Sequence, residues 1–171
     1  LSDLAEIVLD MTGLQTVERS DTISLAALTE EVFCDLDPVA DKHQIRLIQT
    51  EGDCTVTGSY ILLYRAVYNL VENAIKYNRP SGSVTVSIHS AESAVLEVTD
   101  TGIGISPENQ EKIFDPFYRV DKSRSRAMGG AGLGLALVSE IARQHNGQVK
   151  VTQSSEKGST IALILPESTD Y

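Results

Sequence analysis

The chain of 171 residues contains no tryptophan, three phenylalanines and only 14 lysines and arginines. Scarce aromatic side chains disfavour a surface that stacks the bases of nucleic acids. The 24 acidic residues give a formal net charge of −10, which excludes unspecific attraction to nucleic acids or to anionic membranes. We therefore expect no nucleic-acid partner.

Paired cysteines and long apolar runs are also absent. Cys34 and Cys54 have neither the repeated Cys/His spacing of a zinc site nor the cysteine density of a disulfide-stabilised domain. No apolar run is long enough to span a bilayer, and no signal peptide is visible. Because the chain starts at Leu1 rather than at methionine, we expect it to be part of a longer protein.

Apolar residues recur with helical or alternating spacing along most of the chain. The helical spacing predicts helices over residues 1–18, 24–41, 59–77, 107–113 and 132–145, with Pro38 ending or kinking the second and Ser59 capping the third. The alternating spacing predicts strands over residues 45–49, 54–57, 83–89, 94–99, 148–153 and 160–165. Strands in hairpins, without a helical crossover between each pair, favour an α+β fold with a mixed sheet and helices on one face.

Two asparagines four residues apart begin a candidate site. Asn69 and Asn73 project from one face of the helix predicted for residues 59–77, because one helical turn separates them. An amide oxygen is a neutral, hard ligand that suits Mg²⁺, which takes waters and substrate phosphates as its other ligands. One turn further, Lys76 can place an ammonium group against phosphate and Tyr77 can offer a ring to a base. Alternatively, the two amides only cap or bridge neighbouring elements.

A second polar segment, Asp100-Thr101-Gly102-Ile103-Gly104, follows the strand predicted for residues 94–99. A carboxylate at this position can accept a hydrogen bond from the exocyclic amine of adenine, which guanine cannot supply there. Gly102 and Gly104 would let the backbone approach a flat base closely. The alternative is a plain β-turn, in which an aspartate two residues before a glycine is common.

A glycine-rich segment precedes the helix predicted for residues 132–145. Gly130, Gly132 and Gly134 permit backbone conformations that aim N–H groups at an anion, and the helix N-terminus adds partial positive charge. A hinge that lets a loop move would have the same composition. In the basic stretch before it, Arg119 is our candidate for stabilising charge on a γ-phosphate, with a solvated loop as the alternative. No dinucleotide-binding or P-loop motif is present.

In this order, the segments resemble the catalytic ATP-binding domain of two-component sensor histidine kinases. Residues 69–77 are similar to its N box, 100–104 to its G1 box, 114–117 to its F box and 130–135 to its G2 box. The resemblance covers residues 20–166 and is specific, because four boxes occur in the family's order. It implies the Bergerat ATP-binding fold, a two-layer α/β sandwich with a mixed, mostly antiparallel sheet and a mobile ATP lid.

The resemblance also assigns roles to residues. Asn73 would ligate Mg²⁺ with help from Asn69, Lys76 would touch phosphate, Tyr77 would flank the adenine and Asp100 would bind its amine. Asn69, Lys76 and Arg119 would act in catalysis. The other expected nucleotide-binding residues are Gly102, Gly104, Ile105, Gly130, Gly132, Leu133, Gly134, Leu135 and Thr160, the last as a hydroxyl near the base.

Asn69 favours a kinase over a hydrolase. Gyrase-like, mismatch-repair and heat-shock chaperone ATPases of the same superfamily carry a general-base glutamate four residues before the Mg²⁺ asparagine. Here that position is Asn69, and Glu72 projects elsewhere on the helix. Without a base, water attack is slow and the γ-phosphoryl is kept for another acceptor. The alternatives are an ATP-hydrolysing conformational switch, a non-catalytic nucleotide sensor and a protein-serine kinase of the anti-sigma type.

We expect the phosphoacceptor histidine to lie upstream of Leu1. The family's acceptor is followed by an acidic residue, whereas His43, His89 and His145 are not. Expected domains are the end of a dimerisation and phosphotransfer helix at 1–18, a linker to about 22, the catalytic domain at 23–167 and a tail at 168–171. Implied partners are the upstream dimerisation domain, of the same or the partner protomer, and a response-regulator receiver domain. The implied location is cytoplasmic, in a membrane-anchored homodimeric parent protein.

Overall fold

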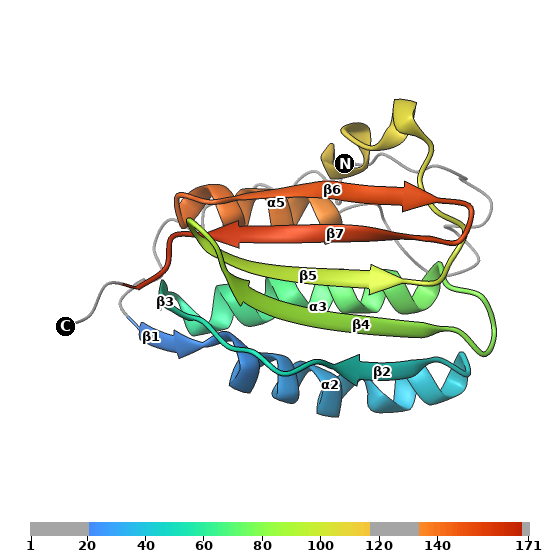
Figure 1. Cartoon of the computed structure of the whole chain (residues 1–171), viewed down its shortest axis with the longest axis horizontal. Helices are drawn as coiled ribbons and strands as arrows, with labels where there is room; N and C mark the ends of the chain where they lie inside the picture. Colours follow the sequence, from blue (N-terminus) through green and yellow to red (C-terminus); the bar gives the residue numbers. More distant parts are fainter. Residues whose placement is uncertain (1–20, 117–133, 169–171) are drawn as a thin grey trace, which may run out of the picture.

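The protein is a two-layer sandwich in which helices cover one face of a five-stranded sheet (Figure 1). The computed structural model describes residues 21–116 and 134–168. The sheet has the order β2-β4-β5-β7-β6 and consists of β2 (Arg46–Gln49), β4 (Ser83–Ser90), β5 (Ala94–Asp100), β7 (Gly158–Leu165) and β6 (Gln148–Ser155). The covering helices are α2 (Leu25–Lys42), α3 (Tyr60–Lys76) and α5 (Gly134–Gln144). The predicted α+β class is confirmed.

Most neighbouring strands of the large sheet are antiparallel, as predicted. β4 pairs with β5, β5 with β7, and β6 with β7 in antiparallel register, whereas β2 pairs with β4 in parallel. The chain between β2 and β4 contains α3, and a crossover of this kind is what a parallel pair requires. The sheet is therefore mixed, with a single parallel pair among its described strands.

A small second sheet was not predicted. The strand β1 (Asp21–Ser24) pairs antiparallel with β3 (Thr55–Gly58), so residues 21–22 are not linker and residue 24 is not yet helix. In β1 only Ile23 is buried, which leaves almost no alternating pattern to detect. The partner strand lies more than thirty residues away along the chain, so this pairing depends on tertiary contacts.

Polar side chains cap the first turns of α2 and α3, and the sequence predicted one of these caps. Ser59 accepts a hydrogen bond from the N–H of Leu62 at the start of α3, as predicted. At the start of α2, the distant residue Asp53 also takes part in the cap, because its carboxylate accepts hydrogen bonds from the Ser24 hydroxyl and the Ala26 N–H. Pro38 lies inside α2 without ending it, and the helix stops about one turn later at Lys42.

The hydrophobic core lies between the helices and the sheet. On β5, Ala94, Leu96 and Val98 are buried and alternate with less buried residues, so they face the helices. The same alternation places Asp100, two residues after Val98, on the helix-facing side at the end of the strand. The core thus carries a carboxylate at its margin.

Two predicted elements differ or are only partly described. Residues 107–114 form two 3₁₀ turns, η1 (Pro107–Asn109) and η2 (Lys112–Phe114), instead of one short helix. The helix predicted for residues 132–145 is observed from Gly134 to Gln144. The helix predicted for residues 1–18, the lid and most of the tail lie outside the described residues.

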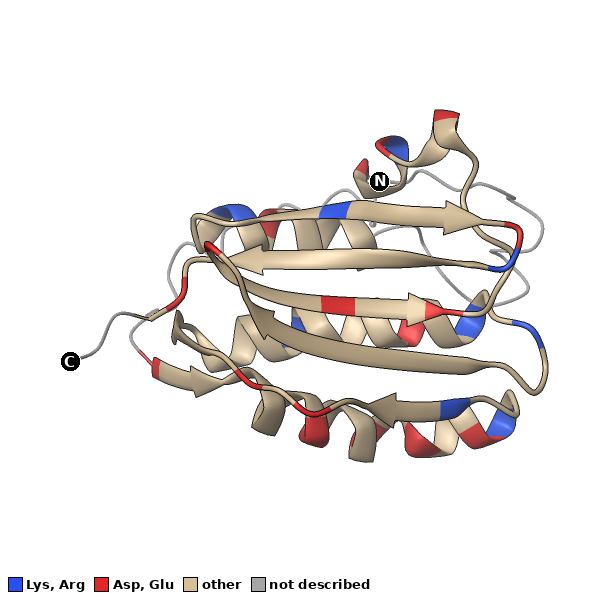
Figure 2. Ribbon diagram, viewed as in Figure 1, with Lys and Arg blue, Asp and Glu red and all other residues tan. Residues whose placement is uncertain are grey.

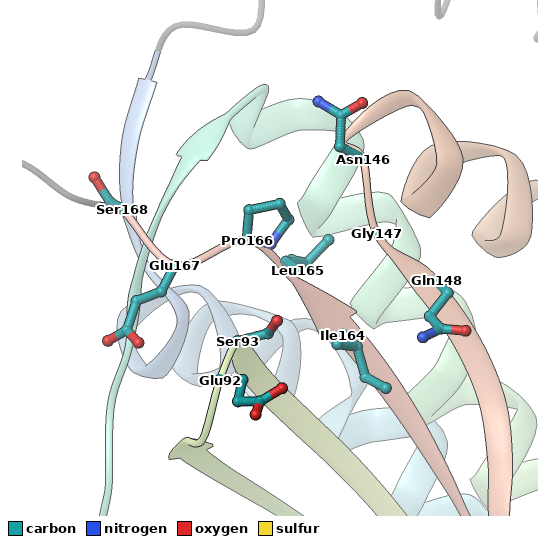
Figure 3. Close-up of a pocket in the computed structure, with 10 residues that line it drawn as sticks. All are labelled: Glu92, Ser93, Asn146, Gly147, Gln148, Ile164, Leu165, Pro166, Glu167 and Ser168. Carbon is teal, nitrogen blue, oxygen red and sulfur yellow. The ribbon is translucent and has the colours of Figure 1, made fainter.

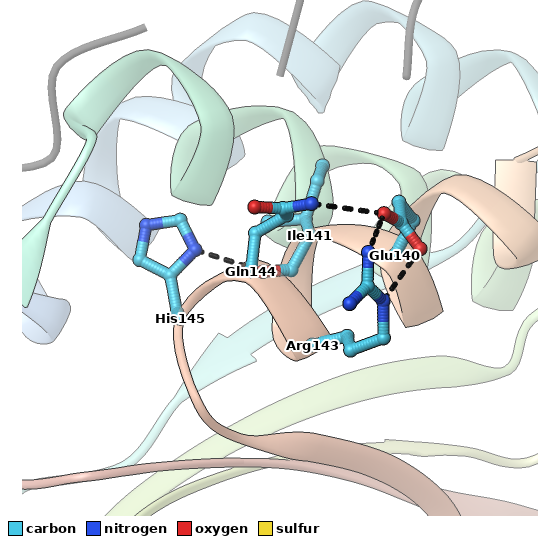
Figure 4. A network of polar contacts seen from close by, with 5 residues as sticks. All are labelled: Glu140, Ile141, Arg143, Gln144 and His145. Carbon is cyan, nitrogen blue, oxygen red and sulfur yellow. Dashed lines mark hydrogen bonds and ion pairs between the residues drawn. The ribbon is translucent and has the colours of Figure 1, made fainter. Parts of the chain in front are cut away.

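His145 joins the end of α5 to the start of α3. Its Nδ1 lies 2.8 Å from the Ile141 carbonyl oxygen (Figure 4). Its Nε2 accepts a hydrogen bond from the Ser59 N–H at 3.1 Å. The ring is buried, and Gly58 passes so close that a Cβ there would lie 2.4 Å from it. His145 thus has a structural role.

We expect His145→Ala to lower the free energy of unfolding by about 2–4 kcal/mol, because it leaves a cavity and an unpaired Ser59 N–H. Urea denaturation followed by circular dichroism measures the change. His89→Ala is the control, since half of that side chain is exposed, and its effect should stay within about 0.5 kcal/mol. Equal effects of the two substitutions would contradict the structural role of His145.

Candidate nucleotide-binding site

The end of α3 and the end of β5 meet at one edge of the molecule. A Cβ on Gly102 would lie 2.4 Å from the Tyr77 carbonyl oxygen, so the turn after β5 packs directly on the last residues of α3. A Cβ on Gly158 would lie 2.0 Å from the Asp100 carbonyl oxygen, which brings the β6–β7 turn to the same place. Gly102 is therefore required for contact with protein backbone, a reason beyond the predicted approach to a base.

Asp100 is held by three hydrogen bonds. Its Oδ1 accepts from the N–H groups of Gly102 at 2.9 Å and Ser159 at 3.3 Å, and its Oδ2 accepts from the Ser159 hydroxyl at 3.0 Å. Burial raises the pKa of the Asp100 carboxyl, and these hydrogen bonds counteract part of the rise. A carboxylate accepts about four hydrogen bonds, so this fixed group has capacity for about one further donor, such as an amine.

The hydroxyl beside Asp100 belongs to Ser159, whereas Thr160, the residue expected near the base, pairs with Thr99. In the register of β5 with β7, Thr160 pairs with Thr99, and the two hydroxyl oxygens lie 2.9 Å apart. Thr99 and Asp100 are consecutive, so their side chains point to opposite faces of the sheet. Alternate residues of a strand share one face, so the face of β7 that carries the buried Leu165 also carries Ser159, six residues earlier. This alternation could have identified Ser159 from the sequence.

We expect Ser159→Ala to weaken ATP binding by about 5- to 10-fold, because Asp100 loses a buried hydrogen bond that fixes its Oδ2. Thr160→Val is the matched control and should change the dissociation constant by less than about twofold, since its hydroxyl faces away from Asp100. Isothermal titration calorimetry measures both. A larger effect of Thr160→Val would restore the original assignment.

Asn69 connects α3 to the start of α5. Its Nδ2 donates a hydrogen bond to the Gly134 carbonyl oxygen at 3.3 Å, which leaves its Oδ1 as the atom that can coordinate a cation. Asn73 lies one turn further along α3 and is half-buried. Among the described residues no group of three or more His, Cys, Asp or Glu side chains could hold a metal ion. A magnesium ion at these amides would therefore take most of its other ligands from phosphate and water, which is the coordination it prefers.

Lys76 and Tyr77 end α3 beside this site. Lys76 Nζ lies 3.6 Å from a Glu72 carboxylate oxygen, and both side chains are partly exposed. Tyr77 is the C-cap of α3, and its N–H donates to the Asn73 carbonyl oxygen. Glu72, the carboxylate nearest to Asn73 along the helix, is therefore paired with Lys76.

Three basic residues lie at this edge, interspersed with the acidic residues Glu72, Asp100 and Glu156 (Figure 2). Lys76 ends α3, Arg79 follows in the α3–β4 loop, and Lys157 lies in the β6–β7 turn. The Arg79 guanidinium donates to the Glu156 carbonyl oxygen at 2.6 Å, which joins the two loops. Along α2, by contrast, the exposed charged residues are mostly acidic.

Ile105 and Leu135 pack against the hydrophobic core and are partly buried. The Ile105 N–H donates to the Ser154 hydroxyl at 2.7 Å, and Gly104 before it has a φ of 78°, which favours glycine. Four further predicted residues lie outside the described part of the chain: Arg119, Gly130, Gly132 and Leu133.

A surface hollow of about 720 Å³ lies at the other end of the sheet (Figure 3). It is lined by the β4–β5 turn, the α5–β6 turn and the residues after β7, including Glu92, Asn146 and Glu167. The turn residue Ser93 precedes β5 and Asp100 ends it, so at about 3.3 Å per residue the hollow and Asp100 lie roughly 20 Å apart. The hollow is separate from the candidate site.

Comparison with known proteins identifies the family. Residues 58–169 match the model of the histidine kinase-, DNA gyrase B- and HSP90-like ATPase family. The structure is similar to the mycobacterial sensor histidine kinase MprB, with 30% identity, a TM-score of 0.72, and coverage of 86% of this chain and 97% of that one. The chain belongs to the histidine kinase family of ATP-binding domains.

Two further relatives of this histidine kinase domain are about twice as long as the chain. The sensor-like histidine kinase SenX3 of Mycolicibacterium smegmatis is 38% identical over 176 residues, which cover 99% of this chain but 46% of SenX3. The histidine kinase ThkA, solved in complex with the response regulator TrrA, has the same fold at 22% identity, with a TM-score of 0.74 and coverage of 98% and 48%. The chain thus spans about half the length of these relatives. None of its described helices is long and apolar enough to cross a membrane.

Proposed function

We propose that this domain binds Mg-ATP and donates the γ-phosphoryl group to a histidine of a separate dimerisation domain of its parent protein. The observation that carries this proposal is the environment of Asn69. An amide, hydrogen-bonded to Gly134, stands where hydrolases of the superfamily have a general base, and the neighbouring Glu72 is paired with Lys76. An amide at position 69 cannot act as a base that activates water, so ATP is preserved for a protein acceptor.

Each residue of the site has a part in the proposed reaction. Asp100 would accept a hydrogen bond from the adenine amine, while Asn69 and Asn73 would hold Mg²⁺, which when bound neutralises charge on the phosphates. Lys76, released from Glu72, and Arg119 would contact the phosphates. The bond between the γ-phosphorus and the bridging oxygen breaks, a phosphorus–nitrogen bond forms to the acceptor imidazole, and ADP leaves.

The relatives support a place in two-component signalling. SenX3 and MprB are named sensor kinases, and ThkA was solved with a response regulator. We propose that the phosphoryl group passes from the acceptor histidine to an aspartate of a response-regulator receiver domain. We also propose a homodimeric parent protein that is anchored in the cell membrane, with this domain on the cytoplasmic side.

Nucleotide binding and phosphotransfer test the proposal in sequence. Titration calorimetry should show ATP binding that weakens when Mg²⁺ is removed with EDTA. Incubated with γ-labelled ATP and the parent's dimerisation domain, the chain should transfer an acid-labile label to that domain and none to itself. Absence of Mg²⁺-dependent ATP binding would refute the proposal. Steady ATP hydrolysis by the isolated chain would favour a conformational switch, and an acid-stable product would favour a serine kinase.

A further inference from the structure

We propose that Asn78 is a positioning residue that holds the adenine-recognising turn against the end of α3. The inference rests on the proposed function, because it assumes that Asp100 meets the adenine. Asn78 follows the last residues of α3 and is 8% exposed. Because its side chain is buried, we assign it an indirect role, exerted on the nucleotide through its neighbours.

The Asn78 side chain ties together three segments of the chain. Its Oδ1 accepts hydrogen bonds from the Thr101 hydroxyl at 2.9 Å and from the Arg79 N–H at 2.8 Å. Its Nδ2 donates to the Ser83 carbonyl oxygen at 2.9 Å. The Thr101 hydroxyl in turn accepts from the Ser83 N–H at 2.9 Å, which closes a ring among the end of α3, the start of β4 and the end of β5.

The backbone around this ring is packed without spare room. A Cβ on Gly82 would lie 2.4 Å from both the Asn78 Oδ1 and the Thr101 Oγ1. A Cβ on Gly102 would lie 3.2 Å from the Asn78 Cα. Thr101 stands between Asp100 and Gly102, so the bond from its hydroxyl to Asn78 sets where the Asp100 carboxylate lies relative to α3.

This placement matters because a nucleotide must satisfy both segments at once. The residues proposed to hold Mg²⁺ and phosphate, Asn69, Asn73 and Lys76, are on α3, whereas Asp100, proposed to bind the adenine, is on β5. If the bond between Asn78 and Thr101 is lost, α3 still holds the phosphates while Asp100 shifts from the adenine amine. The affinity for ATP then decreases because the amine is no longer recognised, and the affinity for a triphosphate without that amine decreases less.

The test compares the affinities for ATP and for inosine triphosphate, which lacks the 6-amino group, at saturating Mg²⁺. Asn78→Ala and Thr101→Val should each lower the preference for ATP by about 5- to 10-fold, as expected for loss of one buried hydrogen bond. Because the two substitutions break the same bond, the double variant should lose little more than either single one. Thr101→Ser keeps the hydroxyl and should retain the wild-type preference.

A variant that is only less stable serves as the control. His145→Ala should lower the melting temperature without changing the preference for ATP, because His145 lies at the other end of α3. If Asn78→Ala and Thr101→Val lower the melting temperature but keep the wild-type preference, Asn78 is structural only and the inference is wrong. If the wild-type chain binds ATP without preferring it to inosine triphosphate, the adenine role of Asp100 and this inference fall together. Failure of the wild type to bind either nucleotide would refute the proposed function itself.

Discussion

Asp100→Asn is expected to abolish most ATP binding, with a dissociation constant raised by about two orders of magnitude. The asparagine can keep its oxygen toward the N–H groups of Gly102 and Ser159, which now donate to Oδ1. The amide NH₂ then takes the place of Oδ2 and opposes the amine of adenine, so two donors face each other. The Ser159 hydroxyl can reverse and accept from the new NH₂ group, which preserves the local structure.

The same substitution should leave the folded domain at least as stable at neutral pH. Because burial raises the pKa of Asp100, the folded state holds the proton more tightly than the unfolded chain, whose carboxyl has an ordinary value of 3.8. Wild-type stability therefore falls as pH rises from 3.8 through the raised folded-state pKa, and then levels off with respect to this group. The Asp100→Asn variant has no carboxyl at this position, so its stability does not fall in this pH range. Its free energy of unfolding relative to the wild type therefore increases as the pH rises through the range.

Urea denaturation at several pH values between 4 and 8, combined with titration calorimetry at pH 7, checks both parts of this prediction. Glu97→Gln is the matched control on the same strand, since Glu97 is partly exposed and pairs only loosely with His89 at 3.7 Å. That variant should keep wild-type ATP affinity. Tight ATP binding by the Asp100→Asn variant would remove Asp100 from adenine recognition.

The second large effect is expected for Asn73→Ala, which should reduce phosphotransfer by about 10²- to 10³-fold. The substitution removes an amide oxygen one turn from Asn69, so Mg²⁺ loses a protein ligand and the charge on the triphosphate is less well neutralised. Because Asn73 is only half-buried and is not part of the hydrophobic core, the fold should tolerate alanine, which also favours helix. ATP affinity should become nearly independent of Mg²⁺.

Titration of Mg²⁺ at fixed ATP, followed by the transfer assay with the dimerisation domain, measures this change. Asn146→Gly is a suitable control, because Asn146 has a φ of 60° that glycine adopts readily and lies beside the hollow at the far end of the sheet. Its Mg²⁺ dependence should equal that of the wild type. An Asn73→Ala variant that retains the full Mg²⁺ effect would exclude Asn73 as a ligand.

Much of the fold was predictable because its signals are local. The stripe of apolar residues on α3, the cap at Ser59 and the alternation along β5 all depend on residues a few positions apart. The pairing of β1 with β3 and the parallel contact of β2 with β4 were not predictable in this way. These short edge strands owe their structure to partners that are distant in sequence.

In the candidate site, too, some features follow from the sequence and others only from the tertiary structure. The residue types at Asn69, Asn73 and Asp100 indicated a nucleotide site from the sequence alone, and asparagine rather than glutamate at position 69 favoured a kinase. Only the tertiary structure assigned the hydroxyl beside Asp100 to Ser159 instead of Thr160, because strand register determines which side chains share a face. Only the tertiary structure joined Asn78 to Thr101 as well. The chemistry of a side chain is a property of its residue, whereas its partner depends on how distant segments pack.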